Sequence, residues 1–256
     1  MKEAKEKMIE VGNIKIGTGK PKICVPVTAG DAAGAVREAE YIVNNLRQDV
    51  DLVELRIDYL REVKNGEKLW KALHEVKDVL ADIPLLCTLR TIGEGGEIAA
   101  GDQEYEELLL GCIQSGAIDL IDVEIFKAGR CFEKIAGEAH KNNIYVLASS
   151  HDFAKTPAKD EMVSRLMMME RAGADIAKIA VMPGDREDVL ALLSASSIAK
   201  TCMDIPVVTI SMGKLGMISR LSGEVFGSCI TFGAGRRASA PGQIAAGKLR
   251  EILELI

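Results

Sequence analysis

A lysine stands in the middle of an apolar run in the segment DIAKIAV, residues 175–181, whose composition is that of a buried strand. A charged ammonium group in a dry interior costs several kcal/mol unless a carboxylate neutralises it or the amine gives up its proton. A neutral amine attacks carbonyl carbons to form an imine, and a protonated imine acidifies the carbon beside it. Lys178 is therefore either a nucleophile or one member of a buried ion pair, for which the candidate partners are Glu54, Asp122 and Glu124.

A histidine ends the preceding apolar run, IYVLASSH, residues 144–151. Histidine exchanges protons near neutral pH because its ordinary pKa is about 6.5. If the two runs are neighbouring strands, His151 lies close to Lys178 and can remove the proton beside an imine as a general base. The next residue, Asp152, is either a partner of that histidine or a helix cap, and we favour the cap.

The second and third apolar runs also end in charged residues. VELRID places Glu54 and Arg56 two residues apart, and therefore on one face of a strand. They form either a buried ion pair or part of a site. TLRTIGEGGE places Arg90 at a strand end and Glu94 in a glycine-rich loop that can run close to a ligand.

Polar residues also follow the later runs. Asp122 and Glu124 share one face of IDLIDVE, and we favour structural pairing with a nearby arginine for both. The segments ISMGKLGMISRLSGEVFGS and TFGAGRRASAPGQI supply Arg220, Ser239 and Gln243. An arginine fork binds carboxylate as well as phosphate, so these segments predict an anion site whose ligand is one or the other.

The elements that position these residues alternate along the chain. Short apolar runs rich in Val and Ile occupy residues 22–27, 51–57, 84–90, 118–124, 144–151, 175–181, 206–211 and 229–233. Segments with helical periodicity follow them at residues 32–48, 67–81, 103–115, 130–142, 159–172, 186–203, 215–225 and 242–255. Eight such repeats predict an α/β fold of parallel βαβ units, a (β/α)₈ TIM barrel, with a doubly wound sheet as the alternative. Chemistry in such barrels collects at the carboxyl ends of the strands.

Local signals mark the ends of several elements. Asp31 and Asp102 stand where helix N-caps are expected, and Gly116 and Gly173 follow expected helix ends. Residues 9–17, IEVGNIKIG, predict a hairpin with a Gly-Asn turn that closes the bottom of the barrel. We expect one barrel domain over residues 1–256, because no linker or charge block divides the chain.

Composition excludes several classes of function. The chain has 256 residues, 48% apolar, and a net charge of −6 without a basic cluster, which disfavours nucleic-acid binding. Its charged start predicts no secretion signal, and no apolar stretch reaches the length of a membrane span. Three histidines give too few ligands for a multi-histidine zinc site. We interpret the cysteines as buried structural thiols of a cytoplasmic protein; they are Cys24, Cys87, Cys112, Cys131, Cys202 and Cys229.

These motifs together resemble one enzyme family, the type I 3-dehydroquinate dehydratases, lyases of the shikimate pathway. The resemblance runs nearly end to end, through PKICVPV, VELRID, TLRTIGEGGE, SSHDF, DIAKIAVMP and the two late segments quoted above. It implies a barrel that is usually a homodimer, with no metal and no organic cofactor. Its substrate would be the small molecule 3-dehydroquinate.

The resemblance also implies a role for each candidate residue. Lys178 would form the Schiff base with the substrate ketone, His151 would be the general acid and base, and Glu94 would orient that histidine and tune its pKa. Arg220 would bind the substrate carboxylate. The remaining substrate-binding residues would be Glu54, Arg56, Arg90, Ser239 and Gln243.

Two other functions remain open at this point. A class I aldolase also forms a lysine imine in a barrel, and it would take a phosphate-bearing substrate. A non-catalytic barrel that serves as a binding protein would trap no imine on Lys178. A biosynthetic role and a role in quinate breakdown use the same reaction, so the residues do not choose between them.

Overall fold

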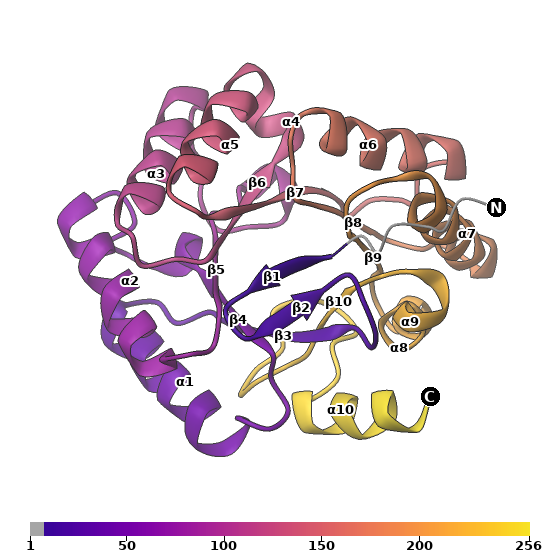
Figure 1. Cartoon of the computed structure of the whole chain (residues 1–256), viewed down its shortest axis with the longest axis horizontal. Helices are drawn as coiled ribbons and strands as arrows, with labels where there is room; N and C mark the ends of the chain where they lie inside the picture. The colour runs from indigo at the N-terminus through magenta and orange to yellow at the C-terminus, as the bar shows by residue number, and fades with distance from the viewer. Residues whose placement is uncertain (1–7) are drawn as a thin grey trace.

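The computed structural model describes residues 8–256, and its centre is a ring of eight parallel strands surrounded by helices (Figure 1). The strands follow each other around the ring in chain order. They are β3 (Lys22–Val27), β4 (Leu52–Arg56), β5 (Leu85–Thr88), β6 (Leu120–Glu124), β7 (Tyr145–Asp152), β8 (Ile176–Val181), β9 (Val207–Ser211) and β10 (Ile230–Phe232). The predicted (β/α)₈ barrel is therefore confirmed.

The ring closes between its last strands. β10 pairs with β3 in parallel register, and Cys229 N donates to Val207 O at 2.8 Å beside a single parallel bridge between Val207 and Ser228. The contact between β9 and β10 is shorter than the ladders elsewhere in the ring, so the barrel is nearly closed.

Helices cover the outside of the ring. They are α1 (Ala32–Asn45), α2 (Gly66–Leu80), α3 (Asp102–Gln114), α4 (Ile125–Ala128), α5 (Phe132–Lys141), α6 (Lys159–Arg171), α7 (Arg186–Cys202), α8 (Ile218–Leu221), α9 (Gly223–Phe226) and α10 (Ala246–Leu255). Short 3₁₀ turns also occur at η1 (Ile57–Tyr59), η2 (Ile92–Glu94), η3 (Gly129–Cys131) and η4 (Leu215–Met217). No helix within residues 8–256 is long and apolar enough to cross a membrane.

Alternation along each strand separates two cores. Outward-facing residues such as Val53 and Leu55 pack against the helices. Inward-facing residues form a lower apolar layer, which includes Leu52, Leu120, Leu147 and Ile176. The next inward positions along the same strands are polar, so the interior changes from apolar to charged toward the carboxyl ends of the strands.

The predicted hairpin lies across the opposite, amino-terminal end of the ring. Strands β1 (Ile9–Val11) and β2 (Ile14–Ile16) pair antiparallel around Gly12 and Asn13, in front of the ring in Figure 1. Val11 and Ile16 are buried in the lower apolar layer. The hairpin therefore seals the bottom of the barrel, as the sequence predicted.

Most of the predicted element ends are confirmed. The Asp31 carboxylate accepts from Gly34 N at 2.8 Å and caps α1. Gly116 and Gly173 directly follow the C-cap residues of α3 and α6 and have φ of +69° and +95°, a backbone conformation that favours glycine. The Asp102 prediction is wrong by one residue, because Asp102 is the first residue of α3 and pairs with Lys127 at 2.6 Å.

Three expected helices differ from the structure. The segment expected at 215–225 is divided into η4, α8 and α9, and the helix expected from 242 begins at Ala246. The helix expected at 130–142 begins with the η3 turn, and α4 precedes it. All six cysteines are free thiols, but Cys131 is half-buried and Cys202 is exposed, so the expectation of burial holds for the other four.

Candidate active site

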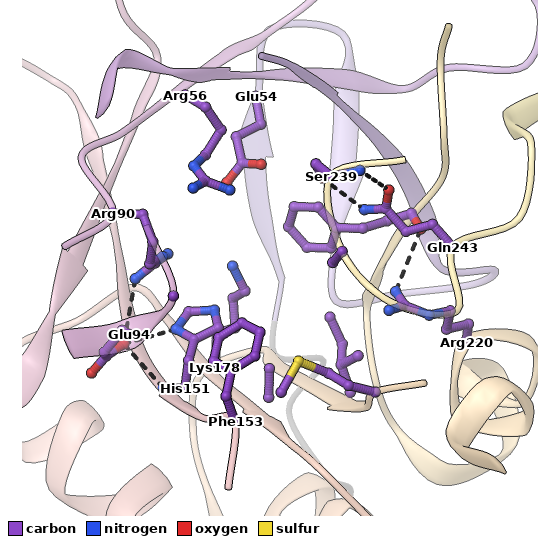
Figure 2. Close-up of a pocket in the computed structure, with 16 residues that line it drawn as sticks. Glu54, Arg56, Arg90, Glu94, His151, Phe153, Lys178, Arg220, Ser239 and Gln243 are labelled. Carbon is purple, nitrogen blue, oxygen red and sulfur yellow. Dashed lines mark hydrogen bonds and ion pairs between the residues drawn. The ribbon is translucent and has the colours of Figure 1, made fainter. Parts of the chain in front are cut away.

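A pocket at the carboxyl ends of the strands has about 530 Å³ of empty space, part of which is open to solvent. Figure 2 shows the labelled side chains surrounding a central space into which Lys178 projects. All nine residues selected from the sequence line this pocket: Glu54, Arg56, Arg90, Glu94, His151, Lys178, Arg220, Ser239 and Gln243.

Lys178 lies in β8 and is 4% exposed. The β7–β8 register pairs it with Ser149, so Lys178 lies one inward-facing layer deeper than His151. Its Nζ is 3.4 Å from Asp122 Oδ2 and 4.5 Å from the centre of the Phe232 ring. Of the three carboxylates proposed as its partners, Asp122 is the one that forms the ion pair.

His151 stands at the upper end of β7 and contacts Glu94 in η2. Glu94 Oε2 is 2.8 Å from His151 Nδ1 and accepts a second hydrogen bond from the backbone N of His151 at 3.0 Å. From these contacts we assign the ring proton to Nδ1, because that oxygen already serves as an acceptor. Nε2 is then an unprotonated base within the pocket.

Burial shifts the pKa values of this pair in opposite directions. Burial, together with the charges of Glu124 and Asp122, raises the pKa of Glu94 to about 8 although Arg90 opposes it. Burial and then the positive charges of Arg90 and Lys178 hold the pKa of His151 well below its usual range. Both shifts disfavour the charged imidazolium–carboxylate pair, so His151 is a neutral imidazole at neutral pH.

Arg90 is buried where the charged groups meet. Its guanidinium donates to Asp122 Oδ2 at 2.7 Å and to Glu124 Oε1 at 3.0 Å, and it lies 3.4 Å from Glu94 Oε2. The predicted structural pairing of Asp122 and Glu124 with an arginine is therefore confirmed. Asp122 Oδ2 is shared by Arg90 and Lys178, with Arg90 the closer of the two.

Of the two alternatives for Glu54 and Arg56, the ion pair between them is not the one that forms, and both residues line the pocket. Arg56 donates instead to both oxygens of Asp58, from Nε and Nη2, each at 2.8 Å. Glu54 Oε1 accepts from Thr88 Oγ1 at 2.8 Å. Burial alone would lower the pKa of Arg56, but the hydrogen bonds and charge of Asp58 raise it, so the guanidinium stays charged.

Arg220 comes from α8 on the opposite side of the pocket and is 2% exposed. Its Nη2 donates to the carbonyl of Pro241 at 3.0 Å, whereas its buried Nε has no hydrogen-bond partner within residues 8–256. Burial lowers its pKa to about 10, so it is still a cation at neutral pH. Gln243 and Ser239 are joined by two hydrogen bonds, at 2.7 and 3.0 Å, in the loop that follows β10.

Sequence reasoning missed the apolar part of the pocket. Phe153, Met212 and Phe232 line it together with the charged groups. In a sequence, apolar residues at strand ends cannot be distinguished from ordinary core residues. Only Phe153 carried a signal, because it directly follows the His-Asp pair of SSHDF. A Cβ on Gly95 would lie 2.3 Å from the Phe153 ring, so this ring packs directly on the loop that carries Glu94.

Asp152 is not a helix cap, because α6 begins seven residues later at Lys159. Its Oδ1 accepts from Ala154 N and Lys155 N, both at 3.0 Å, and so closes a turn after β7. Within residues 8–256 no group of three or more His, Cys, Asp or Glu side chains is arranged to hold a metal ion.

Comparison with known proteins gives this barrel a family. The sequence profile described as Type I 3-dehydroquinase matches residues 23–256, which is nearly the whole chain. The chain belongs to the type I 3-dehydroquinase family. A 3-dehydroquinate dehydratase of Listeria monocytogenes serotype 4b (strain F2365) is 47% identical over 248 residues, which cover 97% of each chain.

Solved structures of the family have the same fold. The 3-dehydroquinate dehydratase of Geobacillus kaustophilus HTA426 superposes with a TM-score of 0.93 at 38% identity, covering 97% of this chain and 96% of that one. The type I enzyme of Clostridium difficile, solved with covalently modified comenic acid, gives 0.92 at 42% identity, covering 98% and 97%. Membership of the family makes the protein a lyase and supports dehydration of 3-dehydroquinate as its reaction.

Proposed function

We propose that this protein dehydrates 3-dehydroquinate through an imine on Lys178, with His151 as the general acid and base. The observation that carries the proposal is the arrangement of Lys178, His151 and Glu94 in one pocket, with the unprotonated His151 Nε2 above a deeper lysine. The family supplies the substrate and the overall reaction.

The substrate is a ketone with a hydroxyl group on the second carbon from the carbonyl. The neutral amine of Lys178 adds to the carbonyl carbon, and loss of water from the adduct gives the imine. Arg90 makes the shorter contact with Asp122 Oδ2, so it neutralises more of that carboxylate than Lys178 does. The remaining negative charge of Asp122 then stabilises the protonated imine.

His151 next takes the proton from the carbon between the imine and the hydroxyl-bearing carbon. The electron pair moves toward the imine nitrogen and returns as the carbon–oxygen bond breaks, while His151 gives its proton to the departing hydroxide, which leaves as water. One further water hydrolyses the imine and restores the amine of Lys178. The proton that His151 accepts is the one it donates, so the histidine ends each cycle neutral.

Binding and chemistry use opposite sides of the pocket. Arg220 lines the pocket, and its buried Nε has no hydrogen-bond partner within residues 8–256, so its guanidinium has donor capacity for the substrate carboxylate. It stands away from the Arg90–Glu94 side (Figure 2). Glu54, Arg56 and Arg90 supply hydrogen-bonding groups for ring hydroxyls, and Ser239 and Gln243 cover the substrate from the last loop. A homodimer, a cytoplasmic address and one domain over residues 1–256 also stay proposals, supported by family resemblance and by composition.

We expect Lys178→Ala to abolish turnover and to leave the fold intact, because Lys178 supplies covalent chemistry whereas Arg220 supplies binding. The measurement is borohydride reduction with 3-dehydroquinate followed by intact mass. The parent should gain the mass of a reduced adduct and Lys178→Ala should not. Lys77→Ala is the matched control, since Lys77 pairs with Asp119 outside the pocket and its loss should leave trapping unchanged. Lys178→Ala activity within about tenfold of the parent would rule out the imine mechanism.

The same experiment separates the other functions. A class I aldolase would trap sugar phosphates in preference to 3-dehydroquinate, and a binding barrel would trap neither. Arg220 on its own binds either anion, so the substrate assay and not the residue decides between carboxylate and phosphate.

A further inference from the structure

The carboxylate of Asp58 connects two parts of the pocket that come from different strands. Asp58 lies in η1, directly after β4, and its side chain is fully buried. Its Oδ1 and Oδ2 accept from Nε and Nη2 of Arg56, both at 2.8 Å. A two-point contact of this kind fixes the plane of a guanidinium as well as its position. The direction in which Arg56 faces the pocket is therefore set by Asp58.

The same two oxygens hold both ends of the loop that carries Glu94. Oδ1 also accepts from the backbone N of Arg90 at 3.4 Å, and Oδ2 accepts from the backbone N of Glu97 at 3.1 Å. Glu94 lies between those two residues and is in contact with His151. Asp58 thus closes the base of the loop whose tip contacts the proposed catalytic histidine.

A second buried carboxylate supports this loop from the other side. Glu124 accepts from Thr91 N at 2.8 Å and from Thr91 Oγ1 at 2.6 Å. Its arginine partner is Arg90, which stands at the base of the same loop, whereas the arginine partner of Asp58 is Arg56, which comes from β4 and also lines the pocket. Asp58 therefore differs from Glu124 in joining the loop to a pocket-lining side chain from a different strand.

We propose that Asp58 is a positioning residue that couples the proposed substrate-binding Arg56 to the Glu94–His151 pair. This inference rests on the proposed function, because it concerns the residues assigned there. A substrate hydroxyl that binds Arg56 therefore acts on Asp58, the same carboxylate that holds the base of the Glu94 loop. Asp58 itself lies behind Arg56 and acts through it and through the loop.

The test is Asp58→Asn. An asparagine keeps one acceptor oxygen, loses the charge and places an NH₂ group against two of the four donors. We expect KM to rise as Arg56 loses its orientation, kcat to fall as Glu94 moves, and kcat/KM to drop on the order of 10²-fold, the effect of a misplacement of about 1 Å. The acid limb of the kcat–pH profile, which reports the protonation of His151, should also shift to higher pH. It should move toward the ordinary histidine pKa because a loosened loop admits water to His151.

Asp51→Asn is the matched control. Asp51 lies just before the start of β4 and likewise accepts from an arginine, Arg250 Nη2 at 2.7 Å, and from a backbone N, that of Ile23 at 2.7 Å. This site is at the opposite end of the barrel from the pocket. Asp51→Asn should lower the thermal midpoint yet leave KM, kcat and the acid limb at parental values.

A double-mutant cycle with Glu94→Gln distinguishes coupling from general loosening. If Asp58 acts through Glu94, its substitution should reduce kcat much less in the Glu94→Gln background than in the parent. Additive losses in kcat, or an Asp58→Asn variant that changes only the thermal midpoint as Asp51→Asn does, would overturn the proposal. Should Asp58→Asn fail to fold, Asp58→Glu keeps the charge and displaces both oxygens, and the same changes in KM and acid limb are expected.

The outcome is separable from that of the proposed function. Borohydride trapping of 3-dehydroquinate on the parent reports the imine whatever Asp58 does. Trapping with parental KM in Asp58→Asn would refute the coupling alone. A parent that neither traps nor dehydrates the substrate would refute both.

Discussion

The charges around His151 decide which group moves the proton. His151 stays neutral because it is buried beside cations, and Glu94 resists ionisation because it is buried beside other carboxylates. The pair therefore presents an unprotonated Nε2 at neutral pH without needing a charged carboxylate behind it. The contact between Nδ1 and Glu94 then fixes the tautomer and the orientation of the ring.

His151→Ala should form the lysine adduct and then process it very slowly, because Lys178 remains and the proton carrier is gone. General acid–base assistance is worth about 10²–10⁴-fold, and one histidine serves several steps here, so kcat should fall by the upper end of that range or more. Borohydride should trap a substrate or product imine on this variant, seen as a mass increase that an additional Lys178→Ala abolishes. Turnover near the parental rate would mean that the base is another group, with Glu94 the first to consider.

Glu94→Gln should make the folded protein more stable at high pH. The pKa of Glu94 is raised to about 8 in the folded state, chiefly by burial, so between its unfolded value and about 8 the folded protein holds a proton that the unfolded chain releases. The stability due to this group is present at low pH and is lost as pH rises through about 8. Each unit of the shift is worth about 1.4 kcal/mol.

Denaturant unfolding at pH 5 and pH 9 measures this effect. The glutamine variant should differ little from the parent at pH 5 and should exceed it in free energy of unfolding by a few kcal/mol at pH 9. A variant that is less stable than the parent at pH 9 would show that Glu94 is a stabilising carboxylate. Because a glutamine keeps the acceptor for His151 Nδ1, this comparison isolates the charge.

At the scale of elements, the period-two alternation of side chains along each strand determines which residues face the pocket. Leu147, Ser149 and His151 all face the barrel interior, and each step along β7 moves from the apolar layer toward the pocket. The same alternation in β8 places Lys178 below the histidine. The loops that follow β5 and β10 then bring Glu94 and Gln243 to the rim, where the ladder no longer sets side-chain direction.

Gly96→Ala should disrupt the Glu94 loop. A Cβ at Gly96 would lie 2.0 Å from the backbone oxygen of Arg90, which cannot move without displacing the strand end. We expect a lower thermal midpoint and a fall in kcat on the order of 10²-fold. Gly93→Ala in the same loop is the control, since its nearest neighbour is a side-chain oxygen at 3.7 Å, and it should remain close to parental. Equal losses in the two variants would show that the loop tolerates no side chain at all, whatever the spacing.

The sequence predicted which residues lie at or just after the carboxyl ends of the strands, but it did not predict contacts that depend on the geometry of a turn. All nine selected residues line one pocket because the parallel strands of a barrel, and the loops and short helix that follow them, meet at the carboxyl ends of the strands. The partner of Arg56 was not predictable, since Glu54 and Asp58 both flank it and only the η1 turn brings Asp58 against it. The helix expected at 215–225 is broken where Gly216 and Gly223 pass close to neighbouring backbone oxygens, a contact that no local pattern reveals.

At the scale of the whole molecule, the barrel separates stability from chemistry. The lower interior layer is apolar and is closed by the hairpin, whereas the charged upper layer opens into the pocket. Buried charges in the upper layer cost stability unless they are paired. A single arginine, Arg90, forms ion pairs with three of the carboxylates there, Asp122, Glu124 and Glu94. The apolar lower end therefore has to supply the folding free energy that the site does not.

The hairpin gives a direct test of that division. Ile16 is completely buried against the lower layer, so Ile16→Ala removes apolar contacts and leaves a cavity. We expect the free energy of unfolding to fall by about 2–5 kcal/mol. KM and kcat of the folded variant should stay at parental values because the pocket lies at the other end of the strands. Lys15→Ala, on the same strand but exposed, should change stability by about 0.5 kcal/mol or less. A large rise in KM for Ile16→Ala, measured well below its thermal midpoint, would show instead that the hairpin and the pocket are coupled through the barrel.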